Sequence, residues 1–134
     1  MCIRDRAASR PDARFRLFGT TNDQPVTGAV AHNLSAPVDD LAGRTDLTSF
    51  AAHLTECGVL VTNDTGGMHL ANALGVPVLA LFGPTNPQRT GPVFQAPVRI
   101  LQPPGCPPTG GGDLASLRPE TVFAAVDEML GTSN

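Results

Sequence analysis

One stretch, residues 59–91, constrains the fold of this 134-residue chain more than any other. An apolar run at 59–61 stops at Asn63 and Asp64; two glycines follow, then a short helical pattern, then Gly75 and a second apolar run. This order predicts a strand, a tight turn, a helix and a strand, and runs that are nearly all apolar are typical of parallel strands covered on both faces. The polar residues therefore gather where a parallel strand passes into a helix, the place where open α/β sheets bind ligands.

The size and charge of the chain limit what this corner can belong to. A chain of 134 residues is long enough for one domain, which buries roughly two thirds of its unfolded surface. The formal charge of −3 gives no basic surplus for nucleic acid, so nucleic acid is not an expected partner. No apolar run approaches the roughly 20 residues of a transmembrane segment and no signal peptide is recognisable, so we expect a cytoplasmic protein.

The three cysteines, Cys2, Cys57 and Cys106, are expected to be thiols. Their number is odd, and no two are close enough in sequence for a CxxC metal-binding pair. Cys57 lies at an apolar position of a predicted helix, where a small core residue is a better interpretation than a reactive thiol. We therefore expect neither a metal site nor a cofactor.

Before the corner, the sequence predicts a strand and two helices. Residues 15–18 form a short strand that ends in turn residues. Residues 25–34 form a weakly patterned helix in which His32 faces solvent. A brief apolar piece at 38–41 comes next.

The second of these helices, after Gly43, has the clearest pattern. Thr45 is the expected N-cap, and Gly58 is the expected left-handed residue that ends the helix. His53 lies off the apolar face and is expected at the surface. The apolar face, at spacing i, i+3, i+4 and i+7, consists of Leu47, Phe50, Ala51 and Leu54.

The part of the chain after the corner's helix alternates strands with turns and closes with a helix. Gly75 is expected to end the corner's helix in the left-handed conformation. The later elements are a strand at 78–82, turns at 83–87 and 88–92, a strand at 98–101, a Pro- and Gly-rich loop at 103–112 and a helix at 119–130.

The start of the corner's helix has the residues of a phosphate site. A helix N-terminus carries free N–H groups and a partial positive charge. Gly66 and Gly67 lack side chains that would keep an anion from the backbone, and the hydroxyl of Thr65 adds a donor. This pattern favours a phosphate or diphosphate as ligand. The alternative is that the glycines only permit a tight turn.

Four further polar residues near the corner allow two interpretations each. Asp64 is either a helix cap alone, or a cap that also accepts hydrogen bonds from sugar hydroxyls beside the phosphate. His69, about one turn into the helix, is either structural or a donor to a bound phosphate. Arg89 and Thr90 either contact phosphate or stabilise their turn.

Several stretches carry a further signal: NDTGGMHLA at 63–71, residues 73–78, 81–87 and 89–92, residues 41–45 with the helix that follows, and the start of the helix at 119–130. Together they closely resemble glycosyltransferase family 9, the bacterial heptosyltransferases of lipopolysaccharide core synthesis. The likeness begins at about residue 15 and covers nearly the whole chain. A match of this length and order is a specific signal.

The resemblance implies a GT-B enzyme of two Rossmann-like domains, with residues 14–134 as the C-terminal, donor-binding domain and the N-terminal acceptor domain missing. It implies a nucleotide-sugar donor, typically ADP-heptose, and a lipopolysaccharide core or lipid A-linked acceptor that binds through the missing domain. It assigns the donor diphosphate to Thr65, Gly66, Gly67 and His69, and the donor sugar to Asp64, with Asp23, Arg89 and Thr90 as candidate nucleoside or phosphate contacts.

The mechanism implied by the resemblance is an inverting, metal-independent transfer by a full-length enzyme at the periphery of the inner membrane. The family's general base lies in the N-terminal domain, and a basic residue that stabilises the leaving diphosphate precedes the first strand seen here. Neither position is present, the chain has no lysine, and many family members have another residue where Gly67 stands. We therefore expect this chain alone to bind nucleotide without turnover.

Residues 1–13 are not assigned to any fold. The first six, MCIRDR, resemble translated sequencing-adapter sequence at the edge of a gene fragment. On this interpretation the chain is the back part of a longer protein.

Two alternatives stay open. The triplet of Asp64, Thr65 and Gly66 also occurs in aspartic peptidases, but there it lies in an all-β barrel, whereas a helical pattern follows it here. A non-enzymatic nucleotide-sugar-binding module or a GT-B epimerase would share both the fold and the pocket.

Overall fold

The computed structural model describes residues 10–131. Residues 1–9, with Cys2, lie outside the described residues, and residues 10–13 form a turn in which the Ala13 N–H donates to the Arg10 carbonyl across 3.0 Å. The chain divides into two compact units, Met1–Phe50 and Ala51–Asn134. The assignment of residues 14–134 to one C-terminal domain stays a prediction.

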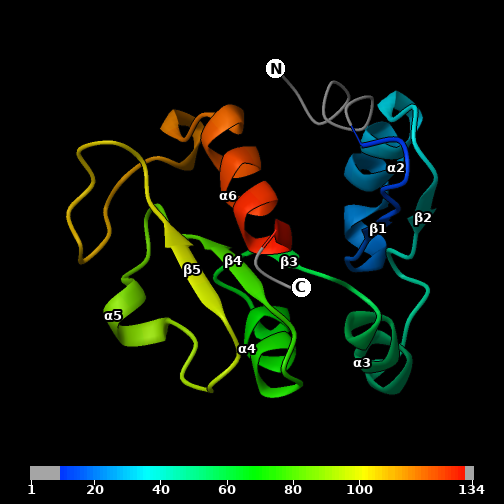
Figure 1. Ribbon diagram of the computed structural model, residues 1–134, viewed down its shortest axis with the longest axis horizontal. Coiled ribbons are helices and arrows are strands. Elements are labelled where there is room, and N and C mark those ends of the chain that lie inside the picture. The colour runs from blue at the N-terminus through cyan, green and yellow to red at the C-terminus, as the bar shows by residue number, and fades with distance from the viewer. Residues whose placement is uncertain (1–9, 132–134) are drawn as a thin grey trace. The chain divides into compact units, whose positions relative to one another are not determined.

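The first unit is a parallel β-α-β arrangement (Figure 1). Strand β1 (Phe15–Leu17) is followed by a short 3₁₀ helix (Thr21–Asp23), helix α2 (Gln24–Asn33) and strand β2 (Val38–Asp40). The two strands pair in parallel, with Phe15 opposite Val38 and Leu17 opposite Asp40. The predicted strand and helix are confirmed to within one residue at each end, and the apolar piece after the helix is a second strand.

A polar contact fastens α2 to the end of β2. Thr27, on the buried side of α2, places its hydroxyl Oγ1 3.1 Å from Oδ2 of Asp40. The other oxygen of Asp40, Oδ1, accepts a bond of 3.2 Å from the N–H of Ala42. Because a buried hydroxyl needs a partner, this pair fixes the side of α2 that contacts the strand. His32 is exposed on α2, as predicted.

Helix α3 (Leu47–Thr55), which crosses the boundary between the units, differs from its prediction at both ends. Its N-terminus is capped by Asp46, whose Oδ1 accepts from the Ser49 N–H at 2.8 Å, so the Thr45 prediction was wrong by one residue. Gly58 is not among the glycines with positive φ. A Cβ on Gly58 would instead lie 2.9 Å from the side chain of Leu130, so this glycine permits close packing.

Three side chains of α3 test its predicted faces. Leu54 is fully buried, as the predicted apolar face requires, but Leu47 of the same face is 73% exposed. Leu47 is the first residue of the helix. His53 is half-buried, so the prediction of a surface position was wrong.

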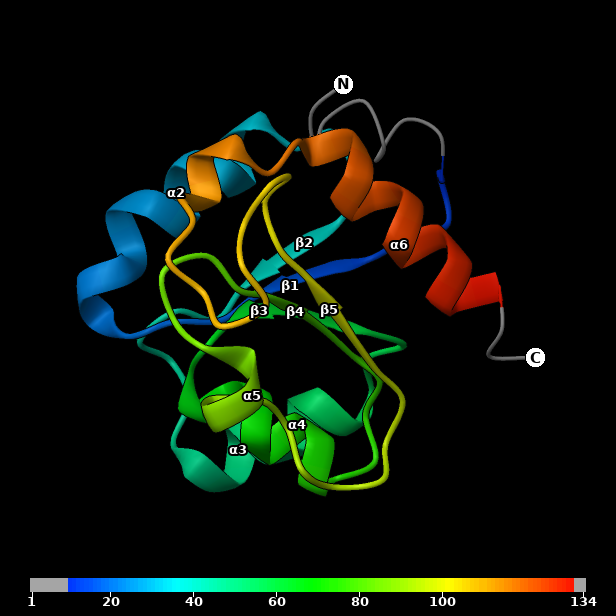
Figure 2. The same ribbon diagram turned by 90° about the vertical axis from the view of Figure 1, so that its left-hand side faces the viewer.

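The second unit is a three-stranded parallel sheet in the order β3-β4-β5. Figure 2 shows helix α4 on one face of this sheet and helix α6 on the other. The predicted strands and helices of this unit are confirmed to within one or two residues, and the 88–92 turn is a short helix. Its elements are β3 (Leu60–Asn63), α4 (Gly66–Ala73), β4 (Val78–Leu81), α5 (Pro87–Thr90), β5 (Val98–Leu101), a 3₁₀ helix (Leu114–Ser116) and α6 (Pro119–Gly131).

The core of this unit lies around β4, the central strand. Its first three residues, Val78, Leu79 and Ala80, are completely buried, as expected for a parallel strand covered on both faces. Strand β3 differs, because its residues alternate between half-buried and exposed, and Val61 is 42% exposed. The prediction that both strands are covered on both faces was therefore wrong for β3.

Helix α4 ends as the sequence predicts. Gly75 has a φ of 82°, in the left-handed region. Its N–H donates to the Asn72 carbonyl at 3.2 Å, and the Val76 N–H donates to the Ala71 carbonyl at 2.9 Å. These two bonds form a Schellman motif, which satisfies the last carbonyls of the helix and turns the chain directly into β4.

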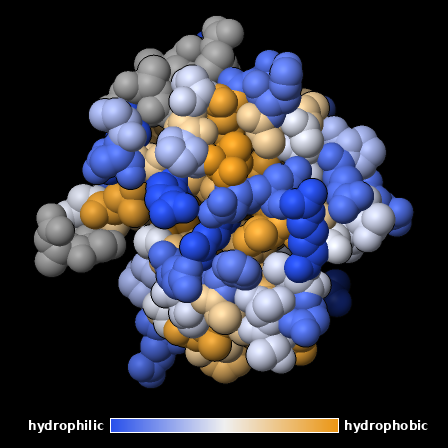
Figure 3. Space-filling view, turned by 90° about the vertical axis from the view of Figure 1, so that its right-hand side faces the viewer, coloured by the Kyte–Doolittle hydropathy of each residue, from blue (hydrophilic) through white to orange (hydrophobic). Residues whose placement is uncertain are grey.

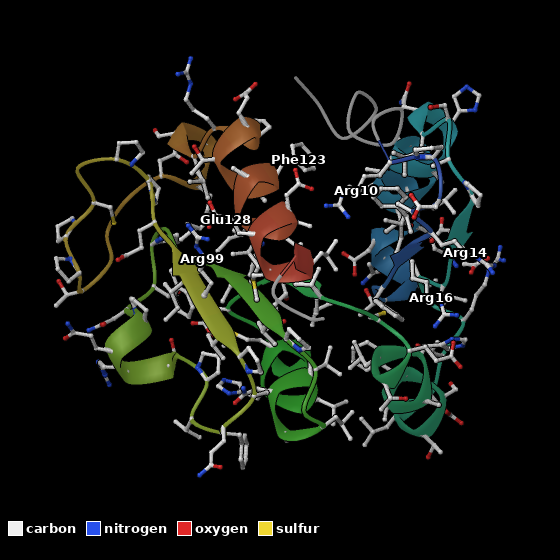
Figure 4. All side chains as sticks on the ribbon, in the orientation of Figure 1. Arg10, Arg14, Arg16, Arg99, Phe123 and Glu128 are labelled. Carbon is white, nitrogen blue, oxygen red and sulfur yellow. The ribbon has the colours of Figure 1, made fainter. Side chains whose placement is uncertain are left out.

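The ion pair of Arg99 on β5 with Glu128 connects the sheet to α6, and Figure 4 shows the two side chains directed toward each other. Apolar side chains left at the surface are spread over several elements, and on the face shown in Figure 3 hydrophilic side chains separate the hydrophobic patches. Cys57 and Cys106 are thiols and not disulfides, as predicted.

Candidate anion and sugar site at the β3–α4 corner

The N-terminus of α4 offers main-chain donors at the carboxyl end of β3. Thr65 is the N-cap residue, with extended φ and ψ of −140° and 165°, and Gly66 and Gly67 are the first two helical residues. The Met68 N–H donates a hydrogen bond of 3.1 Å to the Thr65 carbonyl. The N–H groups of Gly66 and Gly67 donate to no other backbone group among residues 10–131, so both are available to an anion.

The side of Gly66 on which a side chain would stand is open. A Cβ built on this residue would meet no atom within 4 Å. No close packing therefore requires glycine at this position, and φ is not positive there. A glycine at this position leaves room for an anion beside the backbone amides, and this room is not needed for the turn itself.

Asp64 does not cap the helix, contrary to both interpretations of the sequence. Thr65 holds the N-cap position, and its side chain makes no capping bond; its hydroxyl lies 3.1 Å from that of Thr62. The Asp64 carboxylate turns away to Thr90, whose hydroxyl donates to Oδ2 at 2.7 Å. Asp64 is half-buried and lies directly after β3.

A cavity of about 180 Å³ opens beside Asp64, between the ends of β3 and β4. Its polar lining residues are Asn63 and Asp64, at the end of β3, and Thr85, in the turn after β4. The remaining wall is formed by Leu81, Gly83, Pro84 and Leu114. The cavity thus combines a carboxylate and an amide with apolar surface, the combination that a sugar ring needs.

The main chain of a later loop closes one side of this cavity. The N–H groups of Gly111 and Gly112 both donate to the carbonyl of Gly83, each at 3.0 Å. Gly110 has a φ of 91°, and a Cβ on it would lie 2.3 Å from the backbone carbonyl oxygen of Thr85. The Pro- and Gly-rich loop predicted at 103–112 is confirmed as irregular, and it is packed against the cavity rim.

The structure brings five of the predicted site residues together at the corner. The five are Asp64, Thr65, Gly66, Gly67 and, through its bond to Asp64, Thr90. Arg89 is exposed on α5 beside Thr90 and makes no ion pair with residues 10–131. His69 is the fourth residue of α4 and is half-buried, and its imidazole makes no hydrogen bond to the described part of the chain.

Asp23 belongs to the first unit and has local partners. Its Oδ2 accepts bonds from the N–H of Thr20 at 2.7 Å and from the Thr20 hydroxyl at 2.9 Å. These bonds, above all the one from the N–H, lower the pKa of Asp23. Its carboxylate thus stabilises the turn after β1.

The sequence analysis did not single out the remaining residues that line the cavity. Asn63 ends one strand and Thr85 lies in the turn after the next, so their place at the carboxyl edge of the sheet was a usable signal. Leu114 comes from a 3₁₀ helix after the long loop, and no periodicity points to it. Its contribution depends on how that loop folds back.

Over residues 10–131, no group of three or more His, Cys, Asp and Glu side chains is arranged to hold a metal ion. In the same part of the chain, no helix is long and apolar enough to cross a bilayer.

The structure thus defines an α/β protein with parallel sheets, whose strand-to-helix corner carries main-chain amides beside a cavity lined by polar and apolar residues. Residues 6–109 match the sequence profile of Glycosyltransferase family 9 (heptosyltransferase). Because this match covers most of the chain, the chain belongs to glycosyltransferase family 9. The prediction of a Rossmann-like α/β fold with flanking helices is confirmed.

Individual relatives agree with this assignment. The chain is similar to Lipooligosaccharide heptosyltransferase 2 of Haemophilus influenzae, with 40% identity over 81 residues, which is 58% of this chain and 23% of that protein. It also resembles a family 9 glycosyl transferase of Veillonella parvula, with a TM-score of 0.81 and 28% identity over 94% of this chain and 39% of the other.

A second solved structure, the ADP-heptose LPS heptosyltransferase II of E. coli, has a TM-score of 0.81 and 27% identity, over 96% of this chain and 40% of the other. The chain therefore spans less than half the length of these relatives.

Proposed function

We propose that this chain is the donor-binding part of a heptosyltransferase. The whole protein would transfer a heptose-like sugar from a nucleotide sugar, ADP-heptose, to a lipopolysaccharide core or lipid A-linked acceptor. Residues 14–134 would form the C-terminal half of a GT-B enzyme, and the acceptor would bind to the N-terminal half. The reaction would take place in the cytoplasm, with the enzyme at the periphery of the inner membrane.

One observation carries the proposal: the amides of Gly66 and Gly67 and the cavity beside Asp64 lie at the same strand-to-helix corner. A nucleotide sugar carries a charged diphosphate beside a sugar with several hydroxyls, and the corner has a suitable group for each part. The helix N-terminus suits a diphosphate, and a carboxylate suits sugar hydroxyls. The volume of about 180 Å³ is smaller than the roughly 300–1,000 Å³ of pockets that enclose drug-sized ligands, so it suits one sugar ring.

The named relatives support the choice of donor and acceptor. The E. coli protein to which the chain is similar is named for ADP-heptose, and the H. influenzae protein is named for heptosyl transfer to lipooligosaccharide. In our assignment the diphosphate contacts Thr65, Gly66, Gly67 and His69, and Asp64 contacts the donor sugar. Arg89, next to Thr90 in the sequence, is exposed and makes no ion pair with residues 10–131, so we assign it as a further cation for the phosphates.

The chemistry would be a single inverting displacement. A base in the N-terminal half takes the proton of the acceptor hydroxyl, and the resulting oxygen attacks the anomeric carbon of the heptose. The bond from that carbon to the diphosphate oxygen breaks, and ADP leaves with the bonding pair. The amides at the start of α4 stabilise the negative charge that develops on the diphosphate, because they are oriented before the reaction begins.

Of the alternative functions, the fold argues against the aspartic peptidase, and an experiment distinguishes the other two from the transferase. The aspartic peptidase hypothesis requires an all-β barrel, whereas the Asp64 triplet here joins a parallel strand to a helix. A nucleotide-sugar-binding module without activity or a GT-B epimerase would use the same corner. Transfer of labelled heptose from ADP-heptose to a core acceptor by the full-length protein separates the transferase from both.

Calorimetric titration of the chain with ADP-heptose, ADP, UDP-sugars and GDP-sugars tests the donor assignment. We expect ADP-heptose to bind more tightly than ADP, and the uridine and guanosine compounds to bind weakly. The isosteric variant Asp64→Asn is expected to lose the preference for ADP-heptose over ADP and to keep ADP binding. Absence of ADP binding to the chain, or a preference for another nucleotide, would contradict the proposal.

A further inference from the structure

Asp64 and Thr90 are joined by a hydrogen bond although they lie 26 positions apart in the sequence. The Thr90 hydroxyl donates to Asp64 Oδ2 at 2.7 Å, a length typical of a hydroxyl bonded to a carboxylate. The same hydroxyl lies 3.1 Å from the carbonyl of Asn86. A hydroxyl has one proton, and the shorter bond to the anion is the stronger one.

The short helix that carries Thr90 is fixed at both ends. At its start, Asn86 Oδ1 accepts from the Gln88 N–H at 2.9 Å. At its end, the Gly91 N–H donates to the Pro87 carbonyl at 2.9 Å, and a Cβ on Gly91 would lie 2.4 Å from that oxygen. A helix of four residues is not stable by itself, so these end contacts hold Thr90 in place.

We propose that Thr90 is a positioning residue of the donor-sugar site. Its hydroxyl holds Oδ2 of Asp64, so that the carboxylate keeps one orientation and Oδ1 is left to accept hydrogen bonds from the sugar. Oδ1 has no hydrogen-bond partner among residues 10–131, and Asp64 lines the cavity. The inference rests on the proposed function, which assigns Asp64 to the sugar.

The physical effect is preorganisation of the carboxylate. The bond between Cβ and Cγ of an aspartate rotates over a broad range when nothing holds the oxygens. A sugar that binds to a rotating carboxylate must first order it, and this cost lowers the affinity. In the proposed assignment the diphosphate contacts backbone amides at the start of α4, and Thr90 makes no hydrogen bond to these amides. Loss of the Thr90 hydroxyl should therefore weaken the binding of the sugar and leave the binding of the diphosphate unchanged.

The experiment compares three variants in calorimetric titrations with ADP and with ADP-heptose. Thr90→Val keeps the shape of the side chain and removes the hydroxyl, whereas Thr90→Ser keeps the hydroxyl. Thr121→Val is the matched control, because Thr121 is exposed on α6 and lines no part of the cavity. We expect Thr90→Val to lose about tenfold in affinity for ADP-heptose, with ADP affinity unchanged, and Thr90→Ser to restore it.

Each other outcome has a definite meaning. Equal weakening of ADP and ADP-heptose in Thr90→Val would show that Thr90 only supports α5, and unchanged binding of both would show no role; either result overturns the inference. A parent chain that does not prefer ADP-heptose to ADP contradicts the proposed function instead. Thr90→Ala, which also lacks the hydroxyl and favours helix, replaces Thr90→Val in these titrations if that variant does not fold.

Discussion

At the residue scale, a substitution of Gly66 can test ligand binding without disturbing the fold. It is the first residue of α4, and a Cβ on it would meet no atom within 4 Å. Gly66→Ala is expected to leave the free energy of unfolding unchanged or to raise it by up to about 1 kcal/mol, because Ala favours helix. The new methyl group would stand beside the amides, so we expect ADP affinity to fall about tenfold by calorimetry.

The matched control for this prediction is Gly28→Ala. Gly28 lies within α2, its Cβ would also meet no atom within 4 Å, and it has no place at the corner. We expect this variant to show the same or greater stability with unchanged ADP affinity. If Gly66→Ala binds ADP as tightly as Gly28→Ala does, the assignment of the diphosphate to these amides is wrong.

The N-cap residues of α3 and α4 could not be predicted correctly from the sequence. Thr45 was predicted as a cap where Asp46 is the cap, and Asp64 was predicted where Thr65 is. All four residues have side chains suited to capping, so composition cannot choose between neighbours. The choice depends on which residue remains extended as the chain enters the helix, and tertiary packing sets that point.

At the scale of elements, Asn72 fastens helix α4 to the chain before β5. It is 1% exposed; its Oδ1 accepts from the Phe94 N–H at 2.7 Å, and its Nδ2 donates to the Ala96 carbonyl at 3.4 Å. Asn72→Ala would leave the Phe94 N–H without its partner, so we expect the free energy of unfolding to fall by about 1–3 kcal/mol. Urea denaturation measures this loss.

Asn33→Ala is the comparison for this variant. Asn33 is exposed on α2, and its Nδ2 donates to the Ala29 carbonyl at 2.8 Å. Because an exposed group exchanges its partner for water, the change in unfolding free energy should stay within about 0.5 kcal/mol. A loss in Asn72→Ala no larger than in Asn33→Ala would show that the buried amide does not stabilise the chain.

The N-terminus of α3 should respond to acid. Bonds from Ser49, first its N–H and then its hydroxyl, lower the pKa of Asp46 below the usual 3.8. A lowered pKa in the folded state means that ionised Asp46 stabilises the fold above about 3.8, and that this stabilisation is lost as the pH falls through the lowered value. Asp46→Asn keeps a capping side chain without a charge.

We therefore expect the melting temperature of Asp46→Asn to fall below that of the parent at neutral pH. The difference should shrink as the pH falls below about 3.8, because the parent then loses the charge that the variant already lacks. Thermal unfolding followed by circular dichroism over this range measures both. A difference that does not change with pH would contradict the role of the ionised cap.

Elements were predictable where a periodicity or a glycine marks them. The buried run of β4 and the left-handed Gly75 are local signals, and both are confirmed. Helix α5 was predicted as a turn, because four residues are too few to show a helical period. The bond from Thr90 to Asp64 joins the end of α5 to the residue that follows β3, so it depends on tertiary packing and could not be derived from either segment alone.

At the scale of the whole molecule, the binding of the donor and the transfer of the sugar should be separable. We expect the 134-residue chain to bind ADP but to transfer no heptose to a lipopolysaccharide acceptor, because the general base is assigned to the N-terminal half. A radiolabel transfer assay checks this, with the full-length enzyme as positive control. Sustained turnover by the chain alone would refute the assignment of the base.

The general architecture was predictable from the sequence, and the arrangement around the cavity was not. Apolar runs separated by helices indicate parallel strands, and the structure has them in both units. The cavity wall formed by Leu114 and the loop before it depends on contacts between segments far apart in the sequence. Such contacts leave no local pattern, since each segment alone is only a loop.

The way this loop is attached has a consequence for how the site can evolve. Gly83, in the cavity wall, is bound by the N–H groups of Gly111 and Gly112, and every residue type except proline has such a group. Four glycines of the loop restrict the side chain, because Gly105, Gly110 and Gly111 have positive φ and a Cβ on Gly112 would lie 2.7 Å from Sγ of Cys106. Most of the loop can therefore exchange side chains over evolutionary time and present new groups to incoming substrates, while the wall behind them keeps its shape.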